Sequence, residues 1–111
     1  MKVDIKKCGS VAVVKPEESL NWSNADEFKA ELLESIEKNL GRVVLDASSV
    51  TYVDSKGLGS LVEVTQELGQ SGKTLKLCSV NETMRQVIEL TGLWPLFEHF
   101  DDVNSAVRSF L

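Results

Sequence analysis

A serine hydroxyl stands where an apolar, strand-like run gives way to a helical pattern. The segment at this junction reads Asp54-Ser55-Lys56-Gly57-Leu58-Gly59. A helix N-terminus presents unpaired backbone N–H groups and a partial positive charge, and both features favour a phosphate. The two glycines leave room for close approach of the backbone. Ser55 is therefore either an ordinary helix N-cap or the residue on which a phosphate is added or recognised.

The sequence lacks the motifs of several common enzyme classes. The chain contains no GxSxG, GxxxxGK[ST] or HExxH motif, and the two glycines after Lys56 lack the third glycine of a dinucleotide-binding loop. The single histidine, His99, has no second histidine with which to bind a metal. We expect it to be partly buried or on the surface near an edge strand. These absences predict a protein with no enzymatic activity, no catalytic residue, no metal and no cofactor.

Two polar pairs keep a catalytic alternative open. Asp46 and Asp54 could act as paired carboxylates, although each is also placed to end a strand and cap the next element. Ser55 and Lys56 form a formal Ser-Lys pair, but sequence neighbours at a helix entry point in different directions. A small phosphate- or nucleotide-binding enzyme that uses the loop from 54 to 59 is the competing class of function.

Composition predicts one small soluble domain spanning residues 1–111. Hydrophobic residues make up 42% of the chain and charged residues 26%, which are ordinary globular values. Twelve Lys and Arg against seventeen Asp and Glu give a net charge of −5, so nucleic acid is not an expected partner. No apolar run approaches the ~20 residues of a membrane span, and no secretion signal follows Met1. We therefore expect a cytoplasmic protein that does not bind a membrane.

The two cysteines carry no motif of their own. Cys8 and Cys78 lie in separate strand-like segments, without CxxC or histidine spacing. Two reduced core thiols are the expected state, rather than a disulfide or a metal site.

Hydrophobic periodicity along the chain alternates between that of strands and that of helices. Strands are expected over 3–5 and 11–14 as a hairpin, then over 43–45, 75–78 and, at a sheet edge, within 93–100. Helices are expected over 25–40, over 58–68, after a capping box of Ser79 and Glu82, and after Asp101 or Asp102. Because strands and helices alternate after residue 20, the sheet should be mainly parallel, with antiparallel pairing in the opening hairpin.

The junction lies within a longer pattern. It consists of Val43-Val44-Leu45-Asp46 followed by Val50-Thr51-Tyr52-Val53 and the segment 54–59. This pattern resembles the STAS family, which includes anti-sigma-factor antagonists and the C-terminal domains of sulphate transporters. The resemblance extends over nearly the whole chain, since Leu20-Asn21, Ala25 and Phe28 match a second family pattern. Three residues depart from it, because Lys56 replaces a hydroxyl residue, Asn21 replaces Asp, and Glu18 replaces Gly.

The resemblance implies a fold, a switch and partners. The fold would be α/β, with a mixed, mainly parallel β-sheet of four to five strands packed with about four α-helices. Ser55 matches the serine that a partner kinase phosphorylates in antagonists. The partners would be an anti-sigma factor that is also a serine kinase and a PP2C-type phosphatase. The alternative within the family is a scaffold subunit of a transporter or sensory complex that is never phosphorylated. The expected phosphosite-flanking and partner-binding residues are Asn21, Asp54, Lys56, Gly57, Leu58 and Gly59.

Two further residues have two interpretations each. Lys56 is either a solvated first-turn lysine or a counter-charge for a phosphate on Ser55. Trp94 precedes Pro95 in a turn-like stretch. It belongs to the core unless its indole is exposed, in which case it would mark a contact surface.

Overall fold

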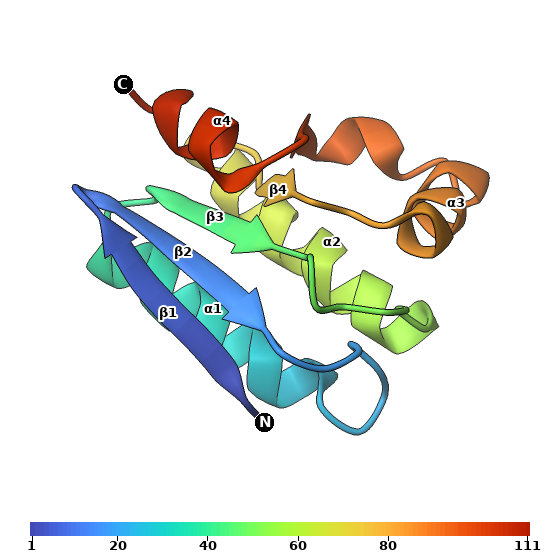
Figure 1. Cartoon of the computed structure of the whole chain (residues 1–111). Helices are drawn as coiled ribbons and strands as arrows, with labels where there is room; N and C mark the ends of the chain where they lie inside the picture. Colours follow the sequence, from blue (N-terminus) through green and yellow to red (C-terminus); the bar gives the residue numbers. More distant parts are fainter.

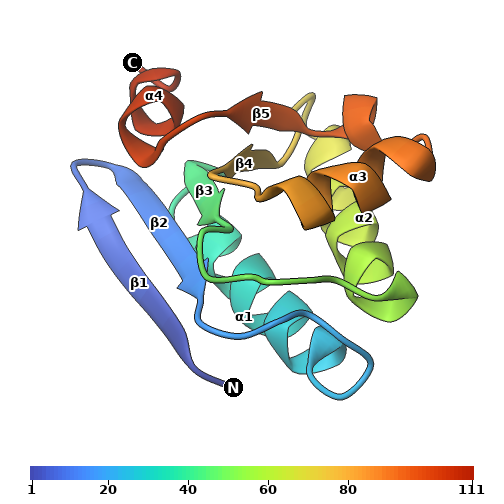
Figure 2. The same ribbon diagram turned by 45° about the vertical axis from the view of Figure 1, so that its right-hand side comes forward.

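Five strands form one mixed sheet with the strand order β1-β2-β3-β4-β5. The computed structural model describes all residues from 1 to 111, and Figures 1 and 2 show the arrangement. The strands are β1 (Val3–Cys8), β2 (Val11–Pro16), β3 (Val43–Asp46), β4 (Lys76–Cys78) and β5 (Glu98–Phe100). The helices are α1 (Ala25–Lys38), α2 (Ser55–Gly69), α3 (Glu82–Leu90) and α4 (Val103–Arg108), with a 3-10 turn over Trp94–Leu96.

The sheet has the predicted pairing. Strands β1 and β2 form an antiparallel hairpin whose turn contains Gly9 at φ +64°. Every other neighbouring pair of strands is parallel. This confirms the expected α/β fold, and the apolar run at 43–45 is the central strand, as its continuous hydrophobicity indicates.

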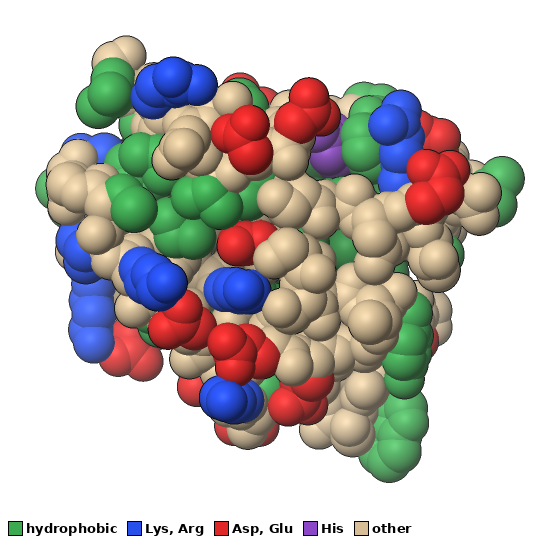
Figure 3. Space-filling model, viewed as in Figure 1, with side chains coloured by type: hydrophobic (Ala, Val, Ile, Leu, Met, Phe, Trp, Pro, Cys, Tyr) green, Lys and Arg blue, Asp and Glu red, His purple; other side chains and the backbone are tan.

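Two hydrophobic clusters hold the sheet between helices. The larger one contains side chains from α1, α2 and α3 on one sheet face, among them Phe28, Leu61 and Met84. The smaller one joins Ala106 of α4 to buried residues of β2, β3 and β4 on the other face. The second face is only partly covered, because α4 is short. Figure 3 shows a hydrophobic area beside α4 and intermixed Lys, Asp and Glu side chains over β1 and β2. None of the helices combines the length and the hydropathy needed to cross a bilayer.

One predicted helix start is wrong. The N-cap of α3 is Asn81, whose side chain accepts a hydrogen bond from the N–H of Met84. Ser79 instead has a positive φ of 59°, and its hydroxyl donates to the carbonyl of Asp101 at 3.4 Å. The capping box fails because Ser79 has a left-handed backbone conformation, whereas an N-cap residue typically has extended backbone angles, as Asn81 does. The last helix begins after Asp102, one of the two predicted caps, whose side chain accepts from the N–H of Ser105.

The two cysteines differ in environment. Both are free thiols, as predicted, but Cys8 is exposed at the end of β1, so its assignment to the core is wrong. The reason is that β1 is an edge strand, and α4 does not extend over its outer face. Cys78 is fully buried. Burial, together with the negative charge of Asp46, raises the pKa of Cys78 to about 11.

Thiol reactivity should report this difference. Only the thiolate reacts with alkylating reagents, so we expect one fast thiol per native chain and two in denaturant. A Cys8→Ser variant should lose the fast phase and keep the slow one. Two fast thiols in the native protein would contradict the burial of Cys78.

Candidate functional site

Three loops meet at the carboxyl ends of the parallel strands, where open α/β sheets bind their ligands. The loop before α1 is joined to the loop before α2 by a short parallel bridge between Leu20 and Val53. Within it, the N–H of Leu20 donates to the carbonyl of Tyr52 at 3.2 Å, and the N–H of Asp54 donates to the carbonyl of Leu20 at 3.1 Å. The loop before α3 joins them through Asn81, whose amide donates to the carbonyl of Val50 at 2.8 Å. The three loops therefore form one connected surface.

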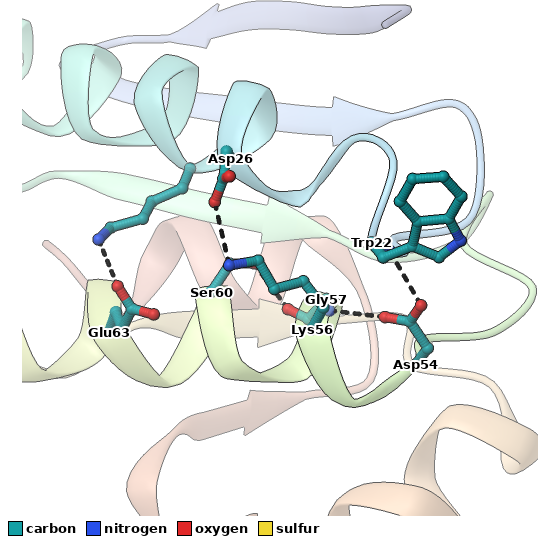
Figure 4. A network of polar contacts seen from close by, with 8 residues as sticks. Trp22, Asp26, Asp54, Lys56, Gly57, Ser60 and Glu63 are labelled. Atoms are coloured by element: carbon teal, nitrogen blue, oxygen red, sulfur yellow. Dashed lines mark hydrogen bonds and ion pairs between the residues drawn. The ribbon is translucent and has the colours of Figure 1, made fainter.

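Asp54 is the N-cap of α2, so the interpretation of Ser55 as the cap is wrong. One carboxylate oxygen of Asp54 accepts from the N–H of Gly57 at 2.8 Å, and the other accepts from the N–H of Trp22 at 2.9 Å. Figure 4 shows both bonds. The hydrogen bond from Gly57, followed by the one from Trp22, holds the pKa of the Asp54 carboxyl below its usual range. This supports the capping role expected for Asp54.

Ser55 is the first residue of α2 and is exposed. Because Asp54 performs the capping, the serine hydroxyl is not needed for the helix start. Ser55 is therefore accessible, and a change at its side chain would leave the cap in place.

The glycines in the first turn of α2 serve different purposes. A Cβ at Gly57 would lie 2.3 Å from the carbonyl oxygen of Leu20, so only glycine allows α2 to start against the first loop. A Cβ at Gly59 would meet nothing within 4 Å. Leu58 is 4% exposed and belongs to the core. Gly57 and Leu58, two of the predicted flanking residues, are therefore buried beneath the site. They fix the start of α2 against the first loop and the core.

Asn21 shapes the first loop. Its side-chain oxygen accepts from the N–H of Ser23 at 2.9 Å and from the hydroxyl of Ser23 at 2.6 Å. Its own N–H donates to the side chain of Asn24 at 2.9 Å. Asn24 is buried and makes no capping bond to α1; its amide donates instead to the carbonyl of Ser19 at 2.8 Å. The side chain of Asn21 therefore stabilises the conformation of the loop before α1.

The loop that Asn21 shapes presents Trp22, which is not among the site residues predicted from the sequence. Trp22 is 78% exposed, while its backbone N–H donates to the carboxylate of Asp54. Tyr52, on the adjoining loop, is 48% exposed. The available signal was a tryptophan in a polar loop next to Asn21, one of the residues in the family pattern. Exposed aromatic side chains of this kind commonly anchor protein interfaces.

Trp94 is half-buried, and its ring packs against that of His99. Their rings are stacked with centroids 3.4 Å apart, and the guanidinium of Arg85 lies 5.1 Å from the indole centroid. A nitrogen of His99 lies 2.8 Å from the carbonyl of Trp94. Burial lowers the pKa of His99. The expectation of a partly buried histidine at an edge strand is confirmed, because His99 lies in β5.

Lys56 points towards α1. Its ammonium lies 3.4 Å from a carboxylate oxygen of Asp26, and both side chains are largely exposed. A second ion pair, between Lys29 and Glu63, also joins α1 to α2. Figure 4 shows the two pairs side by side. Lys56 therefore has an ion-pair partner on α1, and it directly follows Ser55 in the chain.

Comparison with known proteins places this geometry in a family. The model of the STAS domain matches residues 2–106. BtrV of Bordetella bronchiseptica, a proposed anti-sigma factor antagonist, is 29% identical over 99% of this chain and 95% of its own length. A proposed antagonist from Thermotoga maritima is 31% identical over 88% of each chain.

Solved structures agree with the sequence relatives. The crystal structure of a proposed antagonist from Thermotoga maritima has a TM-score of 0.87 at 28% identity, covering 96% of this chain and 92% of that one. The antagonist SpoIIAA in its unphosphorylated form shares the fold, with a TM-score of 0.75 at 17% identity over 98% and 96% of the two chains. The phosphorylated form from Bacillus gives 0.69 at 18% identity over 97% and 99%. The chain belongs to the STAS domain family.

Proposed function

We propose that this chain is an anti-sigma-factor antagonist whose binding is controlled by phosphorylation of Ser55. In its unphosphorylated form it binds an anti-sigma factor that is also a serine kinase, and a sigma factor is thereby released. Phosphorylation of Ser55 ends the binding, and a PP2C-type phosphatase restores it. The observation that carries the proposal is the exposed hydroxyl of Ser55 at the first position of α2, next to a helix cap that does not depend on it. The names of the two relatives, which match over most of their own length, support the same role.

The partner proteins carry out the catalysis. The antagonist contributes a substrate hydroxyl and a binding surface, and the kinase supplies the nucleotide. The surface combines the exposed rings of Trp22 and Tyr52 with the start of α2. A binding surface of this kind needs no cofactor.

The switch results from charge. A phosphate on Ser55 adds about −1.5 to −2 charges, next to the ionised carboxylate of Asp54. The helix N-terminus favours this charge locally, so α2 should remain folded. When the partner binds, however, the phosphate loses water and lies against the partner's surface. Contacts between like charges in such an interface cost several kcal/mol. We therefore attribute release of the partner to interface repulsion and steric conflict.

Phosphopeptide mapping after incubation with the cognate kinase and ATP tests the proposal. We expect one phosphopeptide, containing Ser55, and no label in a Ser55→Ala variant that keeps its partner affinity. Label retained by that variant would overturn the assignment. A wild-type chain that binds a partner without ever becoming phosphorylated would favour the scaffold alternative.

Trp22 should anchor the partner. Truncation of an exposed aromatic anchor at the centre of an interface costs about 2 kcal/mol or more, so Trp22→Ala should weaken partner binding roughly 30-fold. Its thermal stability should stay close to that of the wild type because the ring is exposed. Leu90→Ala is the matched control, since Leu90 is 88% exposed at the end of α3. Equal losses of affinity in the two variants would rule out a specific role for Trp22.

Lys56 should tune the switch without creating it. An exposed ion pair contributes about 0.2–1 kcal/mol and is weakened by salt. Lys56→Ser should therefore change the rate of phosphorylation or dephosphorylation a few-fold, more at low salt than at high salt, and preserve partner binding. Asp26→Asn removes the partner of Lys56 and leaves the lysine free, so it should change the rates in the opposite direction. Unchanged rates in both variants would identify Lys56 as a solvated lysine only.

A further inference from the structure

The free edge of β1 lies on the opposite side of the sheet from β5 and presents unpaired backbone groups. Figures 1 and 2 show β1 as the outermost strand on its side. The N–H of Glu17 donates to the carbonyl of Lys2 at 3.0 Å. Since hydrogen-bonded and non-hydrogen-bonded pairs alternate in an antiparallel ladder, the even-numbered residues of β1 bond to β2. The N–H and C=O groups of Val3, Ile5 and Lys7 therefore point away from the sheet.

The register of β2 supports this assignment. The N–H of Ala12 donates to Arg42, next to β3, at 2.9 Å, so even-numbered residues of β2 face β3. Pro16, which has no N–H, is one of these residues and lies opposite Val3. The odd-numbered residues of β2 are left to pair with the even-numbered residues of β1.

The side chains along this edge leave room for a partner. Ile5 is 50% exposed at the middle of the strand. It lines a groove of about 260 Å³ together with α1 residues, among them Glu31 and Lys38. One carboxylate oxygen of Glu31 is buried and has no hydrogen-bond partner. An exposed apolar side chain, open backbone groups and an unpaired buried oxygen thus occur at one edge.

We propose that a second copy of this chain pairs with β1 through this edge, in an antiparallel arrangement about a two-fold axis. Outward-facing residues must pair with outward-facing residues, and a two-fold axis at Ile5 satisfies this condition. Ile5 then lies opposite Ile5 of the second copy, and Val3 lies opposite Lys7. The two five-stranded sheets join into one continuous sheet, and the surface around Ser55 is not required for the contact.

The charges along β1 indicate that the strand pairing with this edge belongs to a second copy of the chain. In this register Asp4 lies opposite Lys6 of the other chain, and Lys6 lies opposite Asp4. These pairs are of the non-hydrogen-bonded type, in which side chains approach most closely. Within one chain Asp4 and Lys6 are 3.9 Å apart, and their side chains are 42% and 76% exposed. The strand is therefore complementary to its own antiparallel copy, as an isologous interface requires, although each chain carries a net charge of −5.

Charge-reversal variants test the register. Asp4→Lys places lysine opposite lysine at both pairs, and Lys6→Asp places aspartate opposite aspartate. Each single variant should be monomeric at concentrations where the wild type dimerises. An equimolar mixture of the two should form heterodimers, because every cross-strand pair is then of opposite charge. The double variant Asp4→Lys/Lys6→Asp has the wild-type net charge and should dimerise again.

Sedimentation equilibrium of the untagged chain of 111 residues, at concentrations up to ~1 mM so that a millimolar dissociation constant is still measurable, gives the outcome. We expect concentration-dependent dimers for the wild type, the mixture and the double variant, with at least tenfold weaker association for each single variant. Circular dichroism confirms that the single variants are folded. A wild type that remains monomeric throughout, or single variants that dimerise as well as the wild type, would overturn the proposal. Loss of phosphorylation in Ser55→Ala should leave dimerisation unchanged, so this inference and the proposed function fail independently.

Discussion

Replacing Gly57 with alanine should lower the free energy of unfolding by about 1–3 kcal/mol, because the added methyl group overpacks a rigid contact. The new Cβ would lie 2.3 Å from the carbonyl oxygen of Leu20 and 2.7 Å from its carbonyl carbon. Both are backbone atoms, and Leu20 is also fixed by its bridge to Val53. The clash can be relieved only by separating the first loop from α2, which also disturbs the hydrogen bond between Trp22 and Asp54.

Gly59→Ala is the matched control for this variant. Gly59 lies two residues further along the same helix, and its Cβ would meet nothing within 4 Å. Since alanine is the better helix former by about 1 kcal/mol, this substitution should be neutral or stabilising. Urea denaturation of both variants measures the difference. Equal stability for Gly57→Ala and Gly59→Ala would show that the contact with Leu20 is not tight.

Ser55→Asp should weaken partner binding ~10- to 100-fold while leaving the melting temperature close to that of the wild type. Position 55 is exposed at the first position of α2, where a negative charge favours the helix, so the fold should tolerate the carboxylate. The interface should not tolerate it, because the new charge stands next to Asp54. Ser55→Asn is the control, since asparagine has nearly the same shape without the charge. If the aspartate variant lost stability and kept its affinity, release by interface repulsion would be wrong.

The predictable part of the fold is the part that depends on periodicity. The continuous apolar run of β3 and the helical stripes of α1 and α2 can be placed from sequence, because burial of one face imposes a repeat on the residues. The exposure of Cys8 could not be predicted in this way. Strand alternation assigns a residue to a face, but it does not indicate whether a short helix such as α4 reaches far enough to cover it.

Helix caps show a second limit. Asp54 and Ser55 are both common capping residues, and the choice between them depends on the backbone angles that the bridge from Leu20 to Val53 imposes. Likewise, the cap at Asn81 rather than Ser79 results from a left-handed residue that the sequence does not mark. The exposure of Trp22 is a further case, because it results from hydrogen bonds between two loops that are distant in the chain. The position of Ser55 was predictable, whereas the surface around it required the structure.

The central claim is that phosphate on Ser55 decides whether the chain binds its partner. Titration calorimetry of the purified anti-sigma factor with unphosphorylated chain, and with chain fully phosphorylated at Ser55, measures this directly. We predict an affinity at least ~100-fold lower for the phosphorylated chain, equivalent to about 2.8 kcal/mol, and full recovery after treatment with a PP2C-type phosphatase. Equal affinities for the two forms would contradict the account.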